Sequence, residues 1–130
     1  MLEEHGVIKI FEDGEPIFKQ GDAGDEMYVV SPGKVKILKE VEDREVALAV
    51  LEPKDFFGEI ALFGHPRSAS AQAMGKTELI ALDKNTFLSF INEPLVWNVL
   101  ERWSERLKNI YDQLASSVIK EQWRQEHWWL

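Results

Sequence analysis

The first two thirds of the chain alternate between short strand-like segments and turn residues. Seven segments are rich in β-branched and aromatic residues or alternate apolar with polar side chains: Ile8–Phe11, Pro16–Lys19, Met27–Ser31, Val35–Lys39, Val46–Leu51, Ser70–Met74 and Leu79–Leu82. Glycine, proline, aspartate or asparagine bounds each of them, and glycine at such points suits a positive φ or a close backbone approach. Many short strands at this spacing predict a mainly β chain, folded as an antiparallel β-roll or jelly-roll barrel.

After the last of these segments the apolar residues take a helical period. Asp83 is suited to cap a hinge helix over Lys84–Ile91, and Pro94 is suited to begin a second helix. From there the apolar positions recur at alternating steps of four and three residues: Val96, Leu100, Trp103, Leu107, Ile110 and Leu114, with Ser117 next. This seam predicts a long C-terminal helix that forms a homodimer through residues 96–117; the alternative is that the helix docks on the barrel.

Tryptophan is concentrated in the polar tail that follows. Trp123, Trp128 and Trp129 lie in the segment KEQWRQEHWWL. Large amphipathic rings in a polar segment suit either anchors on a partner protein or a lid over a bound base. The sequence leaves both interpretations open.

Charge and composition exclude several classes of function. The 130 residues carry a formal net charge of −8, and residues 1–30 hold eight acidic side chains against two lysines. Nucleic acid is bound mainly by lysine and arginine, so no nucleic acid is expected to bind this chain. There is no cysteine, and His5, His65 and His127 stand apart, so neither a disulfide nor a metal site is expected.

No part of the sequence predicts contact with a membrane. The longest apolar run, Val46–Leu51, is far shorter than a bilayer span. The N-terminal segment MLEEHGVIKIF lacks the basic start and long apolar stretch of a secretory signal. A cytoplasmic location is therefore the default expectation.

One stretch, FFGEIALFGHPRSASA over residues 56–71, combines residues suited to hold a sugar phosphate. Gly58 allows the backbone to approach a ligand closely, and Glu59–Phe63 is long enough for one helical turn whose free N–H groups face an anion. The Arg67 guanidinium can donate two parallel hydrogen bonds to phosphate oxygens, and the Glu59 carboxylate can accept one from a ribose hydroxyl. No base is paired with Ser68 or Ser70, so a hydrolytic nucleophile is not expected.

This stretch resembles the phosphate-binding cassette of the cyclic nucleotide-binding domain of catabolite-activator-type regulators, kinase regulatory subunits and gated channels. Residues 57–71 are similar to the family pattern F-G-E-[IL]-A-L…P-R-[ST]-A. Upstream, FKQGDAGDEMYVVSPGKV over residues 18–35 resembles F-x-x-G-D-x-G-D-x-x-Y-x-[IV]-x-x-G-x-[VA]. The resemblance extends over residues 7–115, with both motifs in the family's order.

The resemblance implies a domain organisation and a function. A β-roll would span residues 1–93, with the cassette at 57–71 and the hinge helix at 84–91, and residues 94–130 would form the C-terminal lid or dimerisation helix and the tail. The domain would be a non-enzymatic sensor that binds cAMP or cGMP and transmits binding through its C-terminal helix to an effector that the sequence does not identify.

The resemblance also implies individual ligand contacts. The residues expected to surround the phosphate are Gly58, Ile60, Ala61, Ser68 and Ala69. Arg67 would pair with the phosphate, and Glu59 would accept a hydrogen bond from the ribose 2′-hydroxyl. Ile37 and Leu51 match strand positions that face the purine. The Ser68 hydroxyl can touch either the phosphate or a guanine amino group, which leaves cAMP and cGMP both open.

The base-binding part of the C-terminal helix departs from the family pattern. The activators offer a Thr-Ser pair to adenine, whereas this chain reads Arg106-Leu107-Lys108-Asn109-Ile110-Tyr111. Arg106 and Tyr111 are therefore the candidate base contacts here.

Two other classes of function compete: a degenerate, ligand-free interaction scaffold with the same fold, and a metal-dependent cupin enzyme, which would need an H-x-H pair that this chain lacks.

Overall fold

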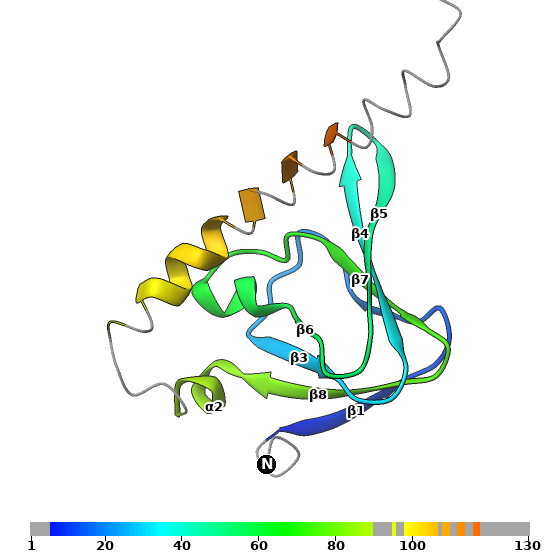
Figure 1. The fold of residues 1–130 in the computed structure, drawn as a ribbon, viewed down its shortest axis with the longest axis horizontal. Helices are drawn as coiled ribbons and strands as arrows, with labels where there is room; N and C mark the ends of the chain where they lie inside the picture. Colours follow the sequence, from blue (N-terminus) through cyan, green and yellow to red (C-terminus); the bar gives the residue numbers. More distant parts are fainter. Residues whose placement is uncertain are drawn as a thin grey trace, which may run out of the picture.

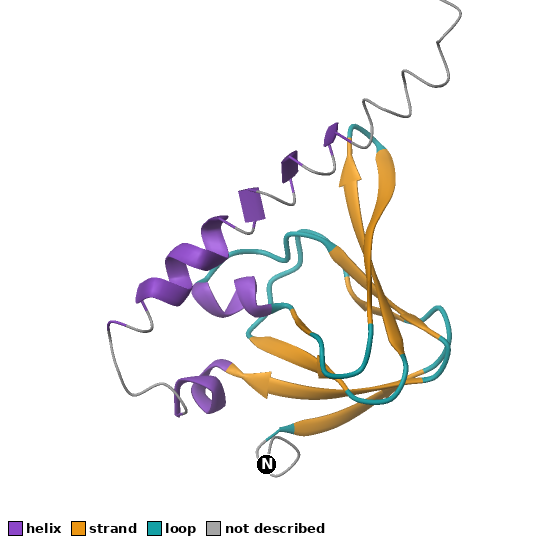
Figure 2. Ribbon diagram, in the orientation of Figure 1, coloured by secondary structure: helices purple, strands orange, loops and turns teal. Residues whose placement is uncertain are grey.

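Two antiparallel sheets form the body of the computed structural model of the chain (Figures 1 and 2). The structure describes residues 6–89, 95, 98–106, 108–109, 112–113 and 116–117. One sheet of four strands has the order β1 (Val7–Phe11), β8 (Thr77–Asp83), β3 (Glu26–Val30) and β6 (Phe56–Phe57). The other has the order β2 (Pro16–Phe18), β7 (Ser70–Met74), β4 (Lys34–Val41) and β5 (Arg44–Leu51).

Each of the seven predicted segments coincides with a strand, except that Lys19 and Ser31 at two segment ends lie outside, and the prediction of a mainly antiparallel β fold is confirmed. The structure adds β6, which is only two residues long and therefore too short to show a period in the sequence. It also lengthens the β4–β5 hairpin, since Val41 pairs with Arg44 across a turn in which Glu42 and Asp43 have φ of 53° and 63°. Such a turn normally carries glycine or asparagine, and so the sequence did not indicate it.

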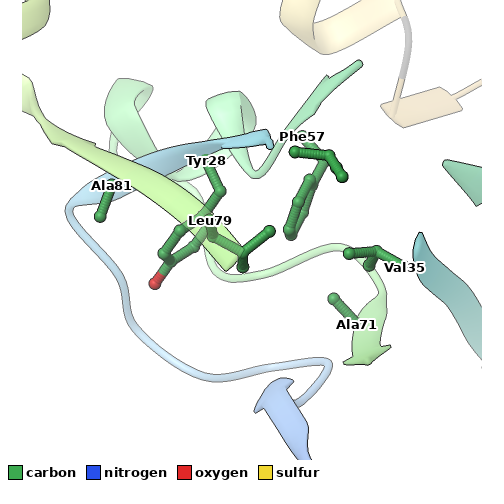
Figure 3. Packing of buried hydrophobic residues seen from close by; sticks show 7 residues of the cluster. Tyr28, Val35, Phe57, Ala71, Leu79 and Ala81 are labelled. Atoms are coloured by element: carbon green, nitrogen blue, oxygen red, sulfur yellow. The ribbon is translucent and has the colours of Figure 1, made fainter. Parts of the chain in front are cut away.

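The core lies between the two sheets and draws on both (Figure 3). Its buried members are Tyr28, Val30, Phe57, Leu79 and Ala81 from one sheet, with Val35 and Ala71 from the other. In β3 and β7 these residues alternate with more exposed ones, whereas β8 is buried continuously over Leu79–Leu82. A second, smaller cluster of Met27, Leu62 and Leu82 connects the first sheet to the short helices.

Two short helices flank the sheets. A 3-10 helix, η1 (Glu59–Phe63), occupies the stretch predicted to form one helical turn. The hinge helix predicted over 84–91 is present as α2 (Lys84–Ser89), and residues 90 and 91 lie outside the described residues. The Thr86 N–H donates to Asp83 Oδ1 at 2.7 Å, so Asp83 caps this helix as predicted.

The C-terminal helical segment consists of the described residues among 95–117, and each of these is helical. Val96, Leu107, Ile110 and Leu114 of the predicted seam, together with Tyr111 and the tail tryptophans, lie outside the described residues. Val99 and Leu100 border an apolar cavity against the β-roll, although Val99 keeps 46 % of its surface exposed, and Leu95 is exposed. No helix in the described part of the chain is long and apolar enough to cross a membrane.

Candidate functional site

A cleft opens between the β4–β5 hairpin and the segment around η1. Its empty volume is about 630 Å³, part of which is open to solvent. Its walls come from three stretches of chain and from Phe18: Ile37, Leu48, Ala49 and Leu51 from the hairpin, Phe56, Phe57, Gly58, Glu59, Ile60 and Ala61, and finally Arg67, Ser68 and Ala69. The hairpin side is apolar, whereas the side formed by residues 58–69 carries one carboxyl group, one guanidinium group and a turn of backbone amides.

A β-bulge shapes the hairpin wall of the cleft. Ile37 pairs with Ala49 and Leu38 with Ala47, so Leu48 has no opposite residue on β4. A bulge breaks the alternation of side chains along a strand. As a result two consecutive residues, Leu48 and Ala49, both line the cleft.

Arg67 is the buried cation of the cleft, with 5 % of its surface exposed. Its two terminal nitrogens donate to backbone carbonyls, Nη1 to Gly58 O at 2.9 Å and Nη2 to Glu26 O at 2.8 Å. Its guanidinium carbon lies 4.2 Å from the centre of the Phe18 ring. Nε is buried without a hydrogen-bond partner in the described structure. A guanidinium held by its neighbours and still short of an acceptor is suited to an anionic ligand.

Two glycines make room for this guanidinium. A Cβ on Gly24 would lie 2.4 Å from Arg67 Nε, and one on Gly58 would lie 2.8 Å from Arg67 Nη1. Gly58 also has a φ of 81° and directly precedes η1. Gly24 has no positive φ, so steric room for Arg67 is what requires glycine at this position.

Nearby acidic groups oppose the effect of burial on the pKa of Arg67. Burial lowers the pKa of Arg67, while Tyr28, Glu26, Asp25 and Asp22 act in the opposite direction. Burial also disfavours ionised Glu26, but hydrogen bonds from Lys9 Nζ and the Tyr28 hydroxyl, both of 2.6 Å, hold the pKa of Glu26 below its usual value. The site therefore carries a fixed ion network behind the guanidinium.

The loop that bears Arg67 is held by the loop after β2. The Gly21 N–H donates to Arg67 O and the Arg67 N–H donates to Asp22 O, both at 2.8 Å. The Gln20 N–H donates to Ser70 Oγ at 2.9 Å. The two stretches that resemble family motifs therefore pair with each other through the backbone.

Glu59 lies at the first position of η1 and lines the cleft. Burial raises the pKa of its carboxyl group, against the opposing effects of a backbone hydrogen bond and of Arg67. A hydrogen bond from a hydroxyl group stabilises the ionised form of a carboxyl group that burial has removed from water. A ribose hydroxyl can donate such a hydrogen bond.

Comparison with known proteins bears directly on this arrangement. Residues 8–93 match the sequence profile of the cyclic nucleotide-binding domain. The chain belongs to this family. It is 42 % identical over 91 residues to the cyclic AMP receptor protein of Thermus thermophilus, a match that covers 68 % of this chain and 42 % of that protein.

Two further relatives support the assignment of this cyclic nucleotide-binding domain. A cAMP-dependent protein kinase regulatory subunit of Mucor circinelloides is 35 % identical over 104 residues, which is 79 % of this chain and 24 % of that protein. The structure of an EAL enzyme in its cAMP-bound form superposes with a TM-score of 0.72 at 28 % identity, covering 92 % of this chain and 33 % of the other. The cGMP-bound form of the same EAL enzyme superposes with a TM-score of 0.71 at 25 % identity, covering 94 % of this chain and 34 % of the other. The domain spans less than half the length of each of these relatives.

The structure brings together most of the residues that the sequence analysis singled out. Those that line the one cleft are Gly58, Glu59, Ile60, Ala61, Arg67, Ser68 and Ala69, with Ile37 and Leu51. Arg106 is exposed and is not among the lining residues. Tyr111 lies outside the described residues.

Other site residues were not found from the sequence. Phe18, Leu48, Ala49 and Phe56 also line the cleft. Phe18 was visible as the first residue of the upstream motif, but its place under the Arg67 guanidinium depends on strand pairing. The bulge that turns Leu48 inward leaves no mark in the sequence pattern.

A second, apolar cavity lies on the other side of η1. It is bordered by Met27, Phe63 and Phe87, by Val99, Leu100, Trp103 and Ser104 of the C-terminal helical segment, and by Phe56 and Glu59. Phe56 and Glu59 border both spaces. The segment Phe56–Phe63 therefore forms the partition between the cleft and the helices.

Proposed function

We propose that this domain binds a purine cyclic nucleotide, cAMP or cGMP, in the cleft and acts as a regulatory rather than a catalytic unit. The observation that carries the proposal is the buried Arg67 guanidinium in the wall of the cleft, whose Nε has no hydrogen-bond partner among the described residues. The cyclic phosphate would lie against Arg67, Ser68, Ala69 and the backbone of residues 58–61. Glu59 would accept a hydrogen bond from the ribose 2′-hydroxyl, and Ile37 and Leu51 would face the base.

The proposal includes transmission of binding to the helices. The short helix η1 forms the cleft wall that would contact phosphate and ribose. The other side of η1 faces the apolar cavity, which α2 and the C-terminal helical segment also border. A nucleotide that prefers one position of η1 over another would shift the preferred position of these helices by its difference in affinity for the two states. The relatives named above, a cAMP receptor protein and a kinase regulatory subunit, are consistent with a regulatory role.

Calorimetric titration of the purified chain with cAMP and with cGMP tests the proposal. We expect binding of at least one of them, and Arg67→Ala should lose at least about a hundredfold in affinity because a desolvated charge pair is removed. Arg67→Lys should recover only part of this, since lysine lacks the planar fork. Arg102→Ala, at an exposed position of the helical segment, is the matched control.

The competing candidate is a ligand-free scaffold. A folded wild-type chain that gives no binding heat with either nucleotide, and no change in thermal stability, would favour it. Unchanged affinity in Arg67→Ala would instead remove Arg67 from the phosphate site.

A further inference from the structure

A buried lysine connects the cleft to the C-terminal helical segment. Lys39 lies near the end of β4, two residues beyond the cleft residue Ile37, and is 8 % exposed. Residues two apart on a strand share a face, so Lys39 faces the same side as Ile37. A buried ammonium group is costly unless charged or polar partners satisfy it, so the partners of Lys39 define what holds it there.

The ammonium group has two such partners. Lys39 Nζ donates to the backbone carbonyl of Ser68 at 2.5 Å and forms an ion pair with Asp112 Oδ1 at 2.7 Å. Ser68 directly follows Arg67, and Asp112 is on the C-terminal helical segment, which passes beside the end of the β4–β5 hairpin in Figure 1. One side chain therefore connects three elements: β4, the cassette loop and the helical segment.

The Ser68 carbonyl belongs to the same peptide group as the Ala69 N–H. No peptide bond in the described structure is cis, so this N–H points away from the carbonyl that Lys39 holds. A hydrogen bond to the carbonyl also polarises the peptide and strengthens the N–H as a donor. Ala69 lines the cleft, where its N–H is proposed to meet the phosphate.

We infer that Lys39 is a positioning residue for the phosphate site and that Asp112 shares in this role. Lys39 orients the Ser68–Ala69 peptide for the phosphate, and Asp112 holds the ammonium group in place when the helical segment is docked. Undocking of the segment weakens nucleotide binding through this contact, and binding in turn favours docking, because coupling between two sites is reciprocal. The inference rests on the proposed function for its ligand, and its geometry is independent of which base is bound.

A double-mutant cycle on the full chain tests the coupling. Lys39→Met keeps the length of the side chain and removes its donors, and should lower the affinity for cAMP or cGMP by about tenfold. Asp112→Asn should lower it by a smaller factor, since Asp112 is 46 % exposed and water screens the pair. In the Lys39→Met background the Asp112 substitution should have no further effect. Lys39→Arg should recover part of the affinity. Lys36→Met, on the opposite face of the same strand, should leave it unchanged.

A second measurement does not need a nucleotide. The ¹⁵N and ¹H resonances of the Ala69 amide respond to a hydrogen bond on the preceding carbonyl, so they should move in Lys39→Met, move less in Asp112→Asn and stay in place in Lys36→Met. A wild-type chain that binds neither nucleotide would overturn the proposed function, and the Ala69 resonances would still decide the role of Lys39.

Several results would overturn the inference while leaving nucleotide binding in place. They are wild-type affinity in Lys39→Met, an undiminished Asp112→Asn effect in the Lys39→Met background, or an Ala69 amide that does not respond. Where Lys39→Met does not fold by circular dichroism, Asp112→Asn decides: wild-type affinity together with an unmoved Ala69 resonance rejects the inference.

Discussion

Glu59 lines the cleft with a carboxyl group that burial makes harder to ionise. Its pKa is raised in the folded domain, so the folded state binds a proton at a pH where the unfolded chain has released it. The contribution of Glu59 to the free energy of unfolding therefore falls as the pH rises from the ordinary value of 4.5 through the raised one. A ribose hydroxyl donates to the ionised form, so a bound nucleotide would shift this pKa downward.

Because a bound nucleotide would lower the pKa of Glu59, the affinity for the nucleotide should depend on pH. Below the raised pKa of Glu59, the affinity for the nucleotide should fall by up to about tenfold per pH unit, because binding then releases one proton. Glu59→Gln should bind more weakly at neutral pH by roughly tenfold to a hundredfold, since a charged hydrogen bond is lost, and its affinity should depend much less on pH. Calorimetry in buffers of different ionisation enthalpy measures both the affinity and the proton release.

Glu52→Gln, at an exposed position before β6, is the control and should keep the wild-type pH profile. An affinity that does not fall as the pH is lowered to the ordinary value of 4.5, with Glu59→Gln indistinguishable from the wild type, would show that Glu59 does not contact the hydroxyl.

Two loops and a strand combine to form the site that holds Arg67, so the position of the guanidinium depends on how these elements pack together. The loop after β2 supplies Gly24, the loop before β7 supplies Arg67, and β3 supplies the Glu26 carbonyl. Backbone hydrogen bonds between Gly21, Asp22 and Arg67 hold the two loops together. A change in the first loop should therefore act on ligand binding through the second.

Gly24→Ala tests this connection. The new methyl group would lie 2.4 Å from Arg67 Nε, so the guanidinium must leave its two carbonyl partners or the loops must separate. We expect an affinity loss of about tenfold or more, with destabilisation of about 1–3 kcal/mol from overpacking. Calorimetry and thermal unfolding measure the two effects.

Ala23→Ser is the matched control, because residue 23 is exposed and adjacent in the same loop. It should change neither affinity nor stability appreciably. Wild-type affinity in Gly24→Ala would mean that the Arg67 position seen here is not the one that binds the nucleotide.

At the scale of the whole molecule, the predicted homodimer requires a face of the C-terminal helical segment that is free to meet a second copy. Leu100 borders the cavity against the β-roll, which agrees with part of the seam docking on the barrel. Val99 and the seam residue Trp103 border the same cavity, yet they remain 46 % and 56 % exposed, and Leu95, four residues before Val99, is 73 % exposed. Apolar side chains exposed at helical spacing leave a surface that a partner helix could cover.

The seam predicted from the sequence is tested at two positions outside the described residues, Leu107 and Ile110. Leu107→Glu/Ile110→Glu places like charges in the apolar stripe of both chains and should convert a dimer into a folded monomer in light scattering. The β-roll has its own core, so its circular dichroism should hardly change. Val99→Glu lies off the seam and should leave the dimer intact.

A wild-type chain that is monomeric at tens of micromolar would show that the seam docks the helix on the β-roll and does not form a dimer. A dimer lost in Val99→Glu but kept in Leu107→Glu/Ile110→Glu would place the interface on the exposed Leu95–Val99–Trp103 face instead.

The strand segments, the capped hinge helix and the residues of the cassette could all be predicted from the amino-acid sequence. Each of these depends on neighbours in the chain: alternation along a strand, Asp83 three residues before Thr86, and Gly58, Glu59 and Arg67 within one short loop. Such short-range patterns can be recognised without knowledge of the fold, because the interactions that they reflect act between residues close in sequence.

The surroundings of that loop, in contrast, depend on how the strands pair and pack. The space for Arg67 at Gly24, the Phe18 ring beneath the guanidinium, the bulge at Leu48 and the contact of Lys39 with Ser68 and Asp112 all join elements that are remote in the chain. In the sequence Lys39 is one more polar residue at the end of a strand. Pairing of β4 with β7 sets it beside Ser68, because β7 begins at Ser70 opposite Leu38. Strand register and sheet packing are properties of the folded chain, and they determine which side chains meet.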